Sequence, residues 1–461
     1  MGLIYIKIVF LILFVNSFIS ISLYLNYRRH AQFLNLTETI IQTSTNFNIT
    51  NSNEFNILNP NKYDHLTRHK ENFLTYLPHD GFNNQRIELE NAIFLAWFLN
   101  RTLIIPPFLY FVGVTPIIAQ PYDKLYDLLS RFIHPNNHFK ENKITFCFSE
   151  DKTESNFRGI KDIQIFDANY NTSSYFQENQ RNCKLVSYTL YNWENLIDFS
   201  FVRRHIKYIH RRDFNFKHLV ESLNIDPNTE VYNVPSDEYP YQVRYYDSSE
   251  SKAELGKYKK RVNLITLSKK PQKLMHFGNV YPLSRITKEL QKSKNFWEKL
   301  MNKMLPNNPI IINVVNRIVD KIGGMDSFIG VHARLGDGYF VKNKDKTVQG
   351  LIKRIQEDFE EISIKNNKPS LPSVIFLATD VKRNDTSLQP FFQTFPCVYT
   401  LDDFSDLLEP LKFLKNPRDG MVMYEFLIPL VDLMVISKGS KFYRTNRSSF
   451  SNYARRLNKI K

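Results

Sequence analysis

Cysteine, glycine and acidic residues are all scarce in this chain of 461 residues. Its three cysteines allow at most one disulfide bond and one free thiol, which excludes a disulfide-stapled scaffold and leaves the pairing of Cys147, Cys183 and Cys397 open. With only 14 glycines and no internal repeat, the chain is neither collagen-like nor of low complexity. The 46 acidic residues are outnumbered by 61 basic ones, and the net charge of +15 favours a polyanionic partner: nucleic acid, lipid headgroups or a phosphorylated small molecule.

A long uncharged apolar run is present near the N-terminus, at residues 8–25. Roughly 20 mostly apolar helical residues cross a bilayer, so the run predicts a membrane anchor, whereas a cleaved signal peptide would be shorter and end in small residues. Sequons for N-glycosylation favour a body in the secretory lumen; they begin at Asn35, Asn48, Asn100, Asn171, Asn384 and Asn446. We therefore expect a single-pass type II membrane protein of the ER or Golgi, bound to the membrane through one N-terminal helix, with no nucleic-acid partner.

The composition changes again after the anchor. Residues 1–27 are expected to form a cytoplasmic tail and signal anchor, and residues 28–70, rich in Asn, Thr and Ser, a flexible stem. From residue 71 onward, apolar runs alternate with helical patterns, which is typical of βαβ units. The sequence therefore predicts an α/β body with a parallel sheet.

The first candidate site is a loop between a predicted strand at residues 73–77 and a predicted helix at residues 84–99. A glycine in such a loop, here Gly81, lets backbone N–H groups and the helix dipole meet a phosphate. The amides of Asn83 and Asn84 can add hydrogen bonds to such a ligand. The alternative is that Asn83 or Asn84 only caps the helix.

The second candidate site follows a predicted strand at residues 327–331. Strand alternation places His332 and Arg334 on one face at the carboxyl end, where open α/β sheets bind ligands. Arg334 is suited to a diphosphate because its planar, always-charged group forms paired hydrogen bonds. Two alternatives remain open: an ion pair between Arg334 and Asp337, and a role of His332 as a metal ligand rather than as a residue that orients the site.

The third candidate site lies in the C-terminal quarter. The predicted strand at residues 373–380 ends at Asp380, which places a carboxylate where a ribose or a base can meet it. Ser448 or Ser449 is a good N-cap for a basic helix that runs to Lys459 and makes a second anion cradle, unless it is a plain helix start. Arg444 and Arg447 flank this segment.

The segments GFNNQR, LNRTLIIPP, HARLGD, IFLATD and SSFS occur in this order, and together they resemble GDP-fucose-dependent protein O-fucosyltransferases and their fungal and plant relatives. The resemblance covers about residues 73–457, although residues 117–274 match no family pattern. HARLGD is also similar to the corresponding segment of α-1,6-fucosyltransferases, so the acceptor is left open as a protein or a glycan.

The resemblance implies two Rossmann-like lobes of the GT-B type, an N-terminal lobe at residues 71–320 and a nucleotide-sugar-binding lobe at residues 321–461. It implies an inverting transfer of fucose from GDP-fucose, in which Arg334 binds the β-phosphate and assists the leaving group. Asn84, or Asn83 after a shift of one residue, would lie near the sugar. The further implied substrate-binding residues are Gly81, Phe82, Asn83, His332, Asp380, Ser448, Ser449 and Phe450.

Two features bear on the chemistry that the resemblance implies. Some family members have a Glu base just before the GFN loop; here the position is Asp80, one methylene shorter, which leaves its catalytic role open. The sequence contains no Asp-x-Asp pair, which agrees with a family that uses no metal, and we expect no cofactor. The alternatives are a glycosyltransferase that uses another nucleotide sugar and a catalytically silent glycan-binding relative.

Two further segments attract attention. Residues 201–213 are strongly basic and predict a helix face that is solvated or lies between the lobes. Residues 275–285 contain His, Gly and Asn and predict a loop near the nucleotide.

Overall fold

The computed structural model describes residues 71–111, 126, 129–130, 143–150, 160–167, 182–234, 243–336, 338–366 and 374–461. All of them belong to one compact unit, Asn56–Lys461. The expected tail, anchor and stem, and also Asp337, lie outside the described residues. Among the helices that the structure describes, none is both long and apolar enough to cross a bilayer.

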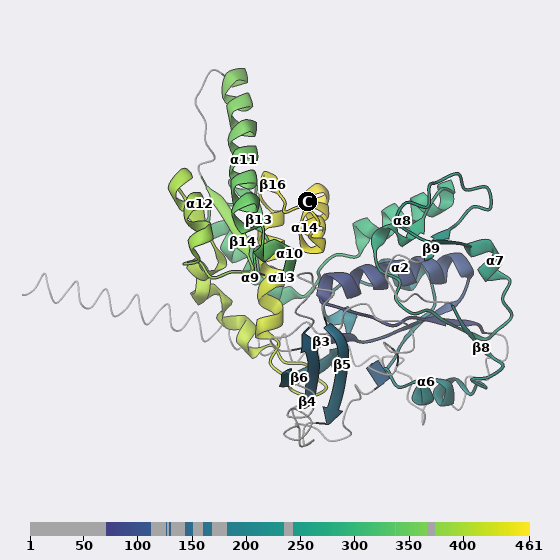
Figure 1. The fold of residues 1–461 in the computed structure, drawn as a ribbon. Coiled ribbons are helices and arrows are strands. Elements are labelled where there is room, and N and C mark those ends of the chain that lie inside the picture. Colours follow the sequence, from purple (N-terminus) through teal and green to yellow (C-terminus); the bar gives the residue numbers. More distant parts are fainter. Residues whose placement is uncertain are drawn as a thin grey trace, which may run out of the picture. The chain divides into compact units, whose positions relative to one another are not determined.

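A five-stranded parallel sheet forms the first part of the fold (Figure 1). Its strands are short and mostly buried, which explains why they are continuous apolar runs rather than alternating patterns. In spatial order they are β7 (Tyr208–His210), β2 (Thr102–Ile105), β1 (Phe73–Thr75), β11 (Leu274–His276) and β8 (Val231–Asn233).

Two smaller sheets accompany it. One is parallel and has the order β10 (Lys260–Asn263), β9 (Val243–Tyr246) and β12 (Ile286–Thr287). The other is antiparallel, with the order β3 (Phe108–Phe111), β6 (Asn182–Tyr191), β4 (Lys143–Glu150) and β5 (Ile160–Asp167). In this antiparallel sheet the Cα atoms of Cys147 and Cys183 are direct register partners, and the third cysteine, Cys397, is free and half-buried.

A four-stranded parallel sheet forms the second part, with the order β15 (Val398–Tyr399), β14 (Ile375–Thr379), β13 (Ile329–Ala333) and β16 (Lys441–Tyr443). Alternate residues of β14 pack into different apolar clusters: Phe376 joins the cluster of α13 (Tyr424–Ser437), and Leu377 that of α11 (Lys344–Asn366). Gly330 in β13 allows α13 to approach closely, because a Cβ there would lie 2.1 Å from the carbonyl oxygen of Ile436.

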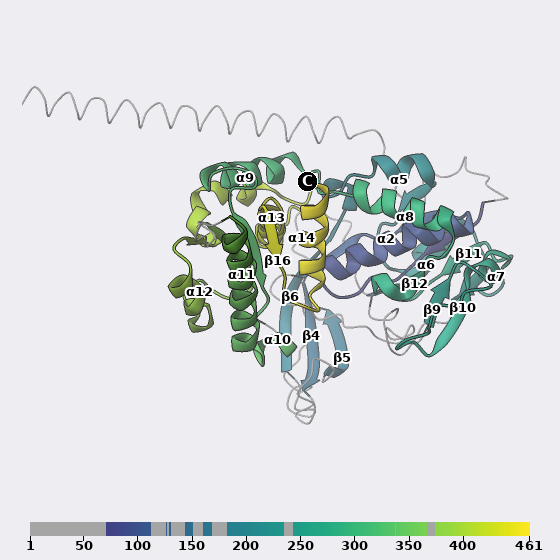
Figure 2. The same ribbon diagram turned by 90° about the horizontal axis from the view of Figure 1, so that it is seen from above.

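The remaining helices lie around these sheets (Figure 2). The longer ones are α2 (Phe82–Leu99), α6 (Phe216–Leu223), α8 (Gln291–Lys303), α9 (Pro309–Lys321) and α14 (Ser449–Ile460). The short ones are α5 (Ser200–His205), α7 (Leu264–Ser268), α10 (Gly338–Val341), α12 (Gln389–Thr394) and the 3-10 helices η1 (Trp193–Asn195), η2 (Leu283–Arg285), η3 (Thr386–Leu388) and η4 (Leu401–Phe413). Helix α9 packs on α13 and η4, beside the four-stranded sheet.

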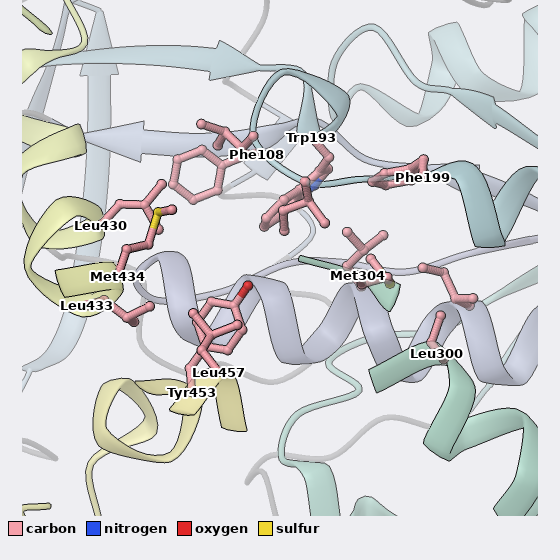
Figure 3. Packing of buried hydrophobic residues seen from close by; sticks show 14 of the residues in the cluster. Phe108, Trp193, Phe199, Leu300, Met304, Leu430, Leu433, Met434, Tyr453 and Leu457 are labelled. Atoms are coloured by element: carbon pink, nitrogen blue, oxygen red, sulfur yellow. The ribbon is translucent and has the colours of Figure 1, made fainter. Parts of the chain in front are cut away.

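Helix α2 is the centre of the largest apolar cluster (Figure 3). Trp193 and Phe108 lie on one side of it, and Tyr453 and Leu457 of α14 on another. A buried ion pair joins the two helices: Arg456 Nη1 lies 2.7 Å from Glu90 Oε1, and Glu90 also pairs with Arg86. Because removal of one partner would leave a buried charge unpaired, a substitution on either helix affects the other.

The α/β class with parallel sheets is confirmed, and the predicted strands and helices occur with shifted ends. Helix α2 begins two residues earlier than expected, at Phe82. The prediction for residues 201–213 is wrong in part, because only α5 is helical there and β7 follows as the edge strand of the sheet, beside β2. The β-branched and aromatic residues of β7 pair with β2, which outweighs the local helical charge pattern.

Candidate functional site

The first region of the site is the Gly81 loop, residues 78–81, between β1 and α2. Gly81 is the N-cap of α2, and no side chain caps the first turn. Asn83 and Asn84 therefore lie inside the helix, which contradicts the interpretation that one of them is the cap. The uncapped N–H groups of the first turn give this end of the helix a partial positive charge.

Asp80 occupies the tip of the Gly81 loop in the left-handed region, with φ 57°. Asn84 Nδ2 donates a hydrogen bond to Asp80 Oδ2 over 2.9 Å, and Gln85 Nε2 donates to the Asp80 carbonyl over 2.8 Å. The side chain is 28% exposed, so the carboxylate is both fixed and accessible. Two predicted catalytic residues, Asp80 and Asn84, are thus in direct contact.

Behind Asp80 lies a buried histidine that the sequence analysis did not identify. His79 Nε2 is 3.3 Å from Asp80 Oδ2, and His79 Nδ1 is 2.6 Å from Glu88 Oε1. The Glu88 carboxylate also accepts the backbone N–H of His79 over 3.0 Å, so it fixes both the main chain and the ring. Burial alone would lower the pKa of His79, but the carboxylates of Glu88 and Asp80 raise it above its usual value.

The expected loop at residues 275–285 does reach this region. Asn279 Nδ2 lies 3.3 Å from His79 Nε2, and Tyr281 packs edge-on against the His79 ring. Asn91 of α2 donates to the carbonyls of Val280 and Pro282, which anchors the loop to the helix. The structure thus places this loop at the Gly81 loop, where Asn279 lies nearest to His79 Nε2 and Arg285 adds a positive charge that lowers the pKa of His79.

The second region is the His332 cluster, which consists of His332, Arg334, Asp380, Thr445 and Ser451. Arg334 Nε lies 3.0 Å from Asp380 Oδ2, and Asp380 Oδ1 accepts the N–H groups of Leu335 and Gly336 over 2.7 and 2.9 Å. Among the described residues, Arg334 thus forms an ion pair with Asp380, from the end of β14, whereas Asp337, its partner in the alternative interpretation, lies outside the described residues. Asp380 braces the turn that carries Arg334.

Gly336 is needed in this turn for a steric reason. A Cβ there would lie 2.8 Å from the Asp380 carbonyl oxygen and 3.0 Å from its carboxylate. A larger residue would push Asp380 away and so move Arg334, whose side chain is 32% exposed.

His332 is buried within neutral hydrogen-bonding partners. Its Nδ1 lies 2.6 Å from Ser451 Oγ, and its ring stacks on Phe450 at 4.4 Å between centroids. Burial, with a smaller effect of Arg334, lowers the pKa of His332 to about 3, so the ring is neutral at physiological pH. Among the described residues no group of three or more His, Cys, Asp or Glu side chains is arranged to hold a metal ion.

Thr445 and Ser451 connect the two strand ends with α14. Thr445 Oγ1 donates to the His332 carbonyl over 2.7 Å and accepts the Arg334 N–H over 3.1 Å. Ser451 Oγ accepts the Thr445 N–H over 3.2 Å. Ser448 caps α14 by accepting the Ser451 N–H, which agrees with the predicted N-cap and is compatible with both an anion cradle and a plain helix start.

The structure assembles the predicted residues into these two regions. Asp80, Gly81, Phe82, Asn83 and Asn84 lie in the Gly81 loop and the first turn of α2, and the ring of Phe82 packs on Phe426 of α13 at 5.5 Å. Of the other predicted residues, Asp380 pairs with Arg334, Phe450 stacks on His332, and Ser448 and Ser449 lie at the start of α14. His79, Glu88, Thr445 and Ser451 were missed; the signal for Glu88 was a carboxylate inside a helix that is buried on nearly all sides.

Comparisons with known proteins add to this geometry. The chain resembles a crystal structure of POFUT1 in complex with GDP-fucose, with a TM-score of 0.37 and 12% identity over 84% of this chain and 94% of that chain. It also resembles the fucosyltransferase NodZ from Bradyrhizobium, with a TM-score of 0.37 and 13% identity over 84% and 93%.

A sequence relative in Arabidopsis thaliana, O-fucosyltransferase 30, is 59% identical over 39 residues, which is 8% of this chain and 8% of that relative. This match therefore spans a small part of either protein. A family model described as GDP-fucose protein O-fucosyltransferase matches residues 73–461, from the first strand to the last residue. The expected resemblance is confirmed: the chain belongs to the GDP-fucose protein O-fucosyltransferase family.

Proposed function

We propose that this chain transfers fucose from GDP-fucose to a hydroxyl group of a protein or glycan acceptor, with inversion at the anomeric carbon. Family membership supports the donor and the reaction class. The observation that carries the proposal for the site is the position of Arg334, a half-exposed guanidinium at the carboxyl end of a parallel strand. Asp380 pairs with its side chain, and Thr445 accepts its backbone N–H.

The charges in the reaction explain why an arginine is needed. Breaking the bond between the anomeric carbon and the phosphate oxygen leaves negative charge on GDP and oxocarbenium character on fucose. A fixed cation that meets this developing charge stabilises the transition state more than the bound substrate. The ion pair with Asp380 holds Arg334 in place before the substrate arrives, so little reorganisation is needed during the reaction.

The Gly81 loop is proposed to hold the sugar and to offer its uncapped helix start to the diphosphate. The side-chain oxygen of Asn83 is buried and has no hydrogen-bond partner among the described residues. A buried acceptor of this kind is costly unless it is paired. A hydroxyl group of fucose would satisfy it, and the neighbouring Asn84 would then orient Asp80.

Binding and turnover of the purified full-length chain test the proposal. We expect calorimetry to detect binding of GDP and GDP-fucose. We also expect the chain to release GDP from GDP-fucose but not to release UDP from UDP-sugars. Tight binding of another nucleotide sugar in preference to GDP-fucose would support the alternative donor. GDP-fucose binding without turnover in the presence of glycan and protein acceptors would support a catalytically silent relative.

We also propose a GT-B arrangement in which the five-stranded and four-stranded parallel sheets are the cores of the two lobes, and a lumenal body behind an N-terminal anchor. The sequons at Asn100, Asn384 and Asn446 start at exposed residues, which supports access for glycosylation. An endoglycosidase-sensitive mass shift in a carbonate-resistant membrane fraction is expected. Release of the unglycosylated chain by carbonate would contradict the anchor.

A further inference from the structure

Glu88, His79 and Asp80 form a chain of side chains that runs from the interior to the surface. Glu88 and His79 have side chains that are 0% and 1% exposed, and Asp80 is 28% exposed. The order carboxylate, imidazole, carboxylate matches the general logic of an oriented catalytic group, in which a buried acid fixes a histidine and the histidine fixes the group that meets the substrate.

Two properties of this chain favour a chemical role for Asp80. Its backbone lies in the left-handed region, which most side chains disfavour. The next residue is Gly81, which would adopt this conformation more easily, yet the loop places Asp80 there. Its carboxylate is held by Asn84 from α2 and by His79 from its own loop, so two elements determine its direction.

We propose that His79 and Glu88 are positioning residues that hold the carboxylate of Asp80, which stands where some family members have their base and takes the proton of the attacking hydroxyl. This inference rests on the fucosyl transfer proposed above. In the step, the acceptor oxygen forms a bond to the anomeric carbon and gives its proton to Asp80. The bond from that carbon to the phosphate breaks, and its electron pair leaves with GDP.

Charge balance explains the need for the buried Glu88. The charged groups that face His79 are Glu88 from α2, Asp80 from the Gly81 loop and Arg285 from η2. With the ring protonated, its Nε2–H donates toward Asp80. Once pH rises through the raised pKa of His79, Nε2 becomes an acceptor that faces a carboxylate, and Asp80 loses its support.

The test uses the full-length chain with GDP-fucose as donor and water as acceptor, and measures GDP release against pH. Asp80→Asn is expected to fold, because Asn accepts a positive φ, and to lower kcat by about 100-fold while KM for GDP-fucose stays within about twofold. Wild-type kcat should decline at alkaline pH. This alkaline decline should move to lower pH in Glu88→Gln and disappear in His79→Gln.

The matched control is His218→Gln, because His218 Nδ1 also lies 2.8 Å from a carboxylate, that of Asp213, but at the start of α6. It should leave the pH profile unchanged. The inference is overturned if Asp80→Asn keeps kcat within threefold, or if Glu88→Gln and His79→Gln retain the wild-type alkaline decline. Should Glu88→Gln fail to fold, the other two variants decide. If the wild-type chain neither binds GDP-fucose nor releases GDP, the proposed function fails instead.

Discussion

The two regions of the candidate site each contain a buried histidine, and the pKa values of these two histidines are shifted in opposite directions. His79 faces the carboxylates of Glu88 and Asp80, which raise its pKa above the usual value against the effect of burial. His332 contacts the hydroxyl of Ser451 and the ring of Phe450, and burial lowers its pKa to about 3. Burial favours the neutral form in both regions, so the partners determine the charge.

This difference separates two tasks. In the Gly81 loop the ionised groups are arranged around a proton that can move, whereas in the His332 cluster neutral hydrogen bonds hold a permanent cation, Arg334. A neutral His332 adds no second positive charge beside Arg334, and its contacts with Ser451 and Phe450 connect β13 to α14.

The largest expected effect is that of Arg334→Ala. If the permanent cation of the His332 cluster stabilises the leaving diphosphate, GDP release from GDP-fucose should fall by about 100- to 1,000-fold. Arg334→Lys keeps the charge but loses the planar fork, and should recover only part of the rate. The measurement is kcat at saturating GDP-fucose, with circular dichroism as the control for folding. Unchanged turnover in Arg334→Ala would show that the cation acts elsewhere.

The next effect concerns acid stability. Because the pKa of His332 is about 3 in the folded chain and near 6.5 when unfolded, the unfolded state binds an extra proton as pH falls below 6.5. The folded state should lose about 2 kcal/mol from this residue between pH 6.5 and pH 5. Urea unfolding should show this loss in the wild type and a smaller one in His332→Asn.

His79 affects stability in the opposite direction. Its contribution to the unfolding free energy is complete below pH 6.5 and is lost as pH rises through its raised pKa.

Parallel curves for the wild type and His332→Asn between these pH values would contradict the neutral state of His332. The same comparison made above pH 7 is a control. There His332 is largely unprotonated in both the folded and the unfolded state, so the difference in unfolding free energy between the wild type and His332→Asn should not change with pH.

A smaller effect is expected for Ser451→Ala, which removes a fully buried hydroxyl that is shared by His332 Nδ1 and the N–H of Thr445. Leaving these groups without a partner should cost about 1–2 kcal/mol of unfolding free energy. Ser449→Ala, two residues earlier and half-buried, is the matched control and should cost less than about 0.5 kcal/mol. Equal losses would show that the neutral network is not what holds the cluster.

The smallest effect comes from backbone strain, which occurs in the Gly81 loop at Asp80, with φ 57°, and next to the His332 cluster at Arg447, with φ 66°. Arg447→Asn should stabilise the chain by a few tenths of a kcal/mol, because Asn tolerates this conformation, although the cation–π contact of Arg447 with Tyr339 is lost. Thermal unfolding measures the shift. A clear destabilisation would show that the contact with Tyr339 outweighs the strain.

Much of the architecture follows from local sequence patterns. The strands that end at Arg334 and Asp380 are apolar runs followed by polar residues, so their positions at a sheet edge were predictable. Local patterns did not predict where helix α2 starts, because Gly81 rather than an asparagine occupies the N-cap.

The interaction partners of the site residues were harder to predict from the sequence. Glu88 meets His79 only because the Gly81 loop folds back over nine residues, and Asp380 meets Arg334 because two strands are neighbours in the sheet. Both contacts depend on tertiary structure, and a single sequence offers no spacing rule for them. The ion pair between Arg334 and Asp337, which the sequence left open as an alternative, involves a residue outside the described ones and stays untested.

The buried contact between α2 and α14 has a consequence for protein engineering. Helix α2 starts at the Gly81 loop and α14 starts at the Ser448 segment, and Arg456 joins them through Glu90 while Arg86 and Arg456 both lie over the ring of Tyr453. A chimera that imports α14 from a relative with a different residue at the position of Arg456 would leave Arg86 as the only one of these two arginines that still pairs with the buried Glu90. The two helices are therefore one exchangeable cassette, and grafts intended to alter donor specificity should carry both.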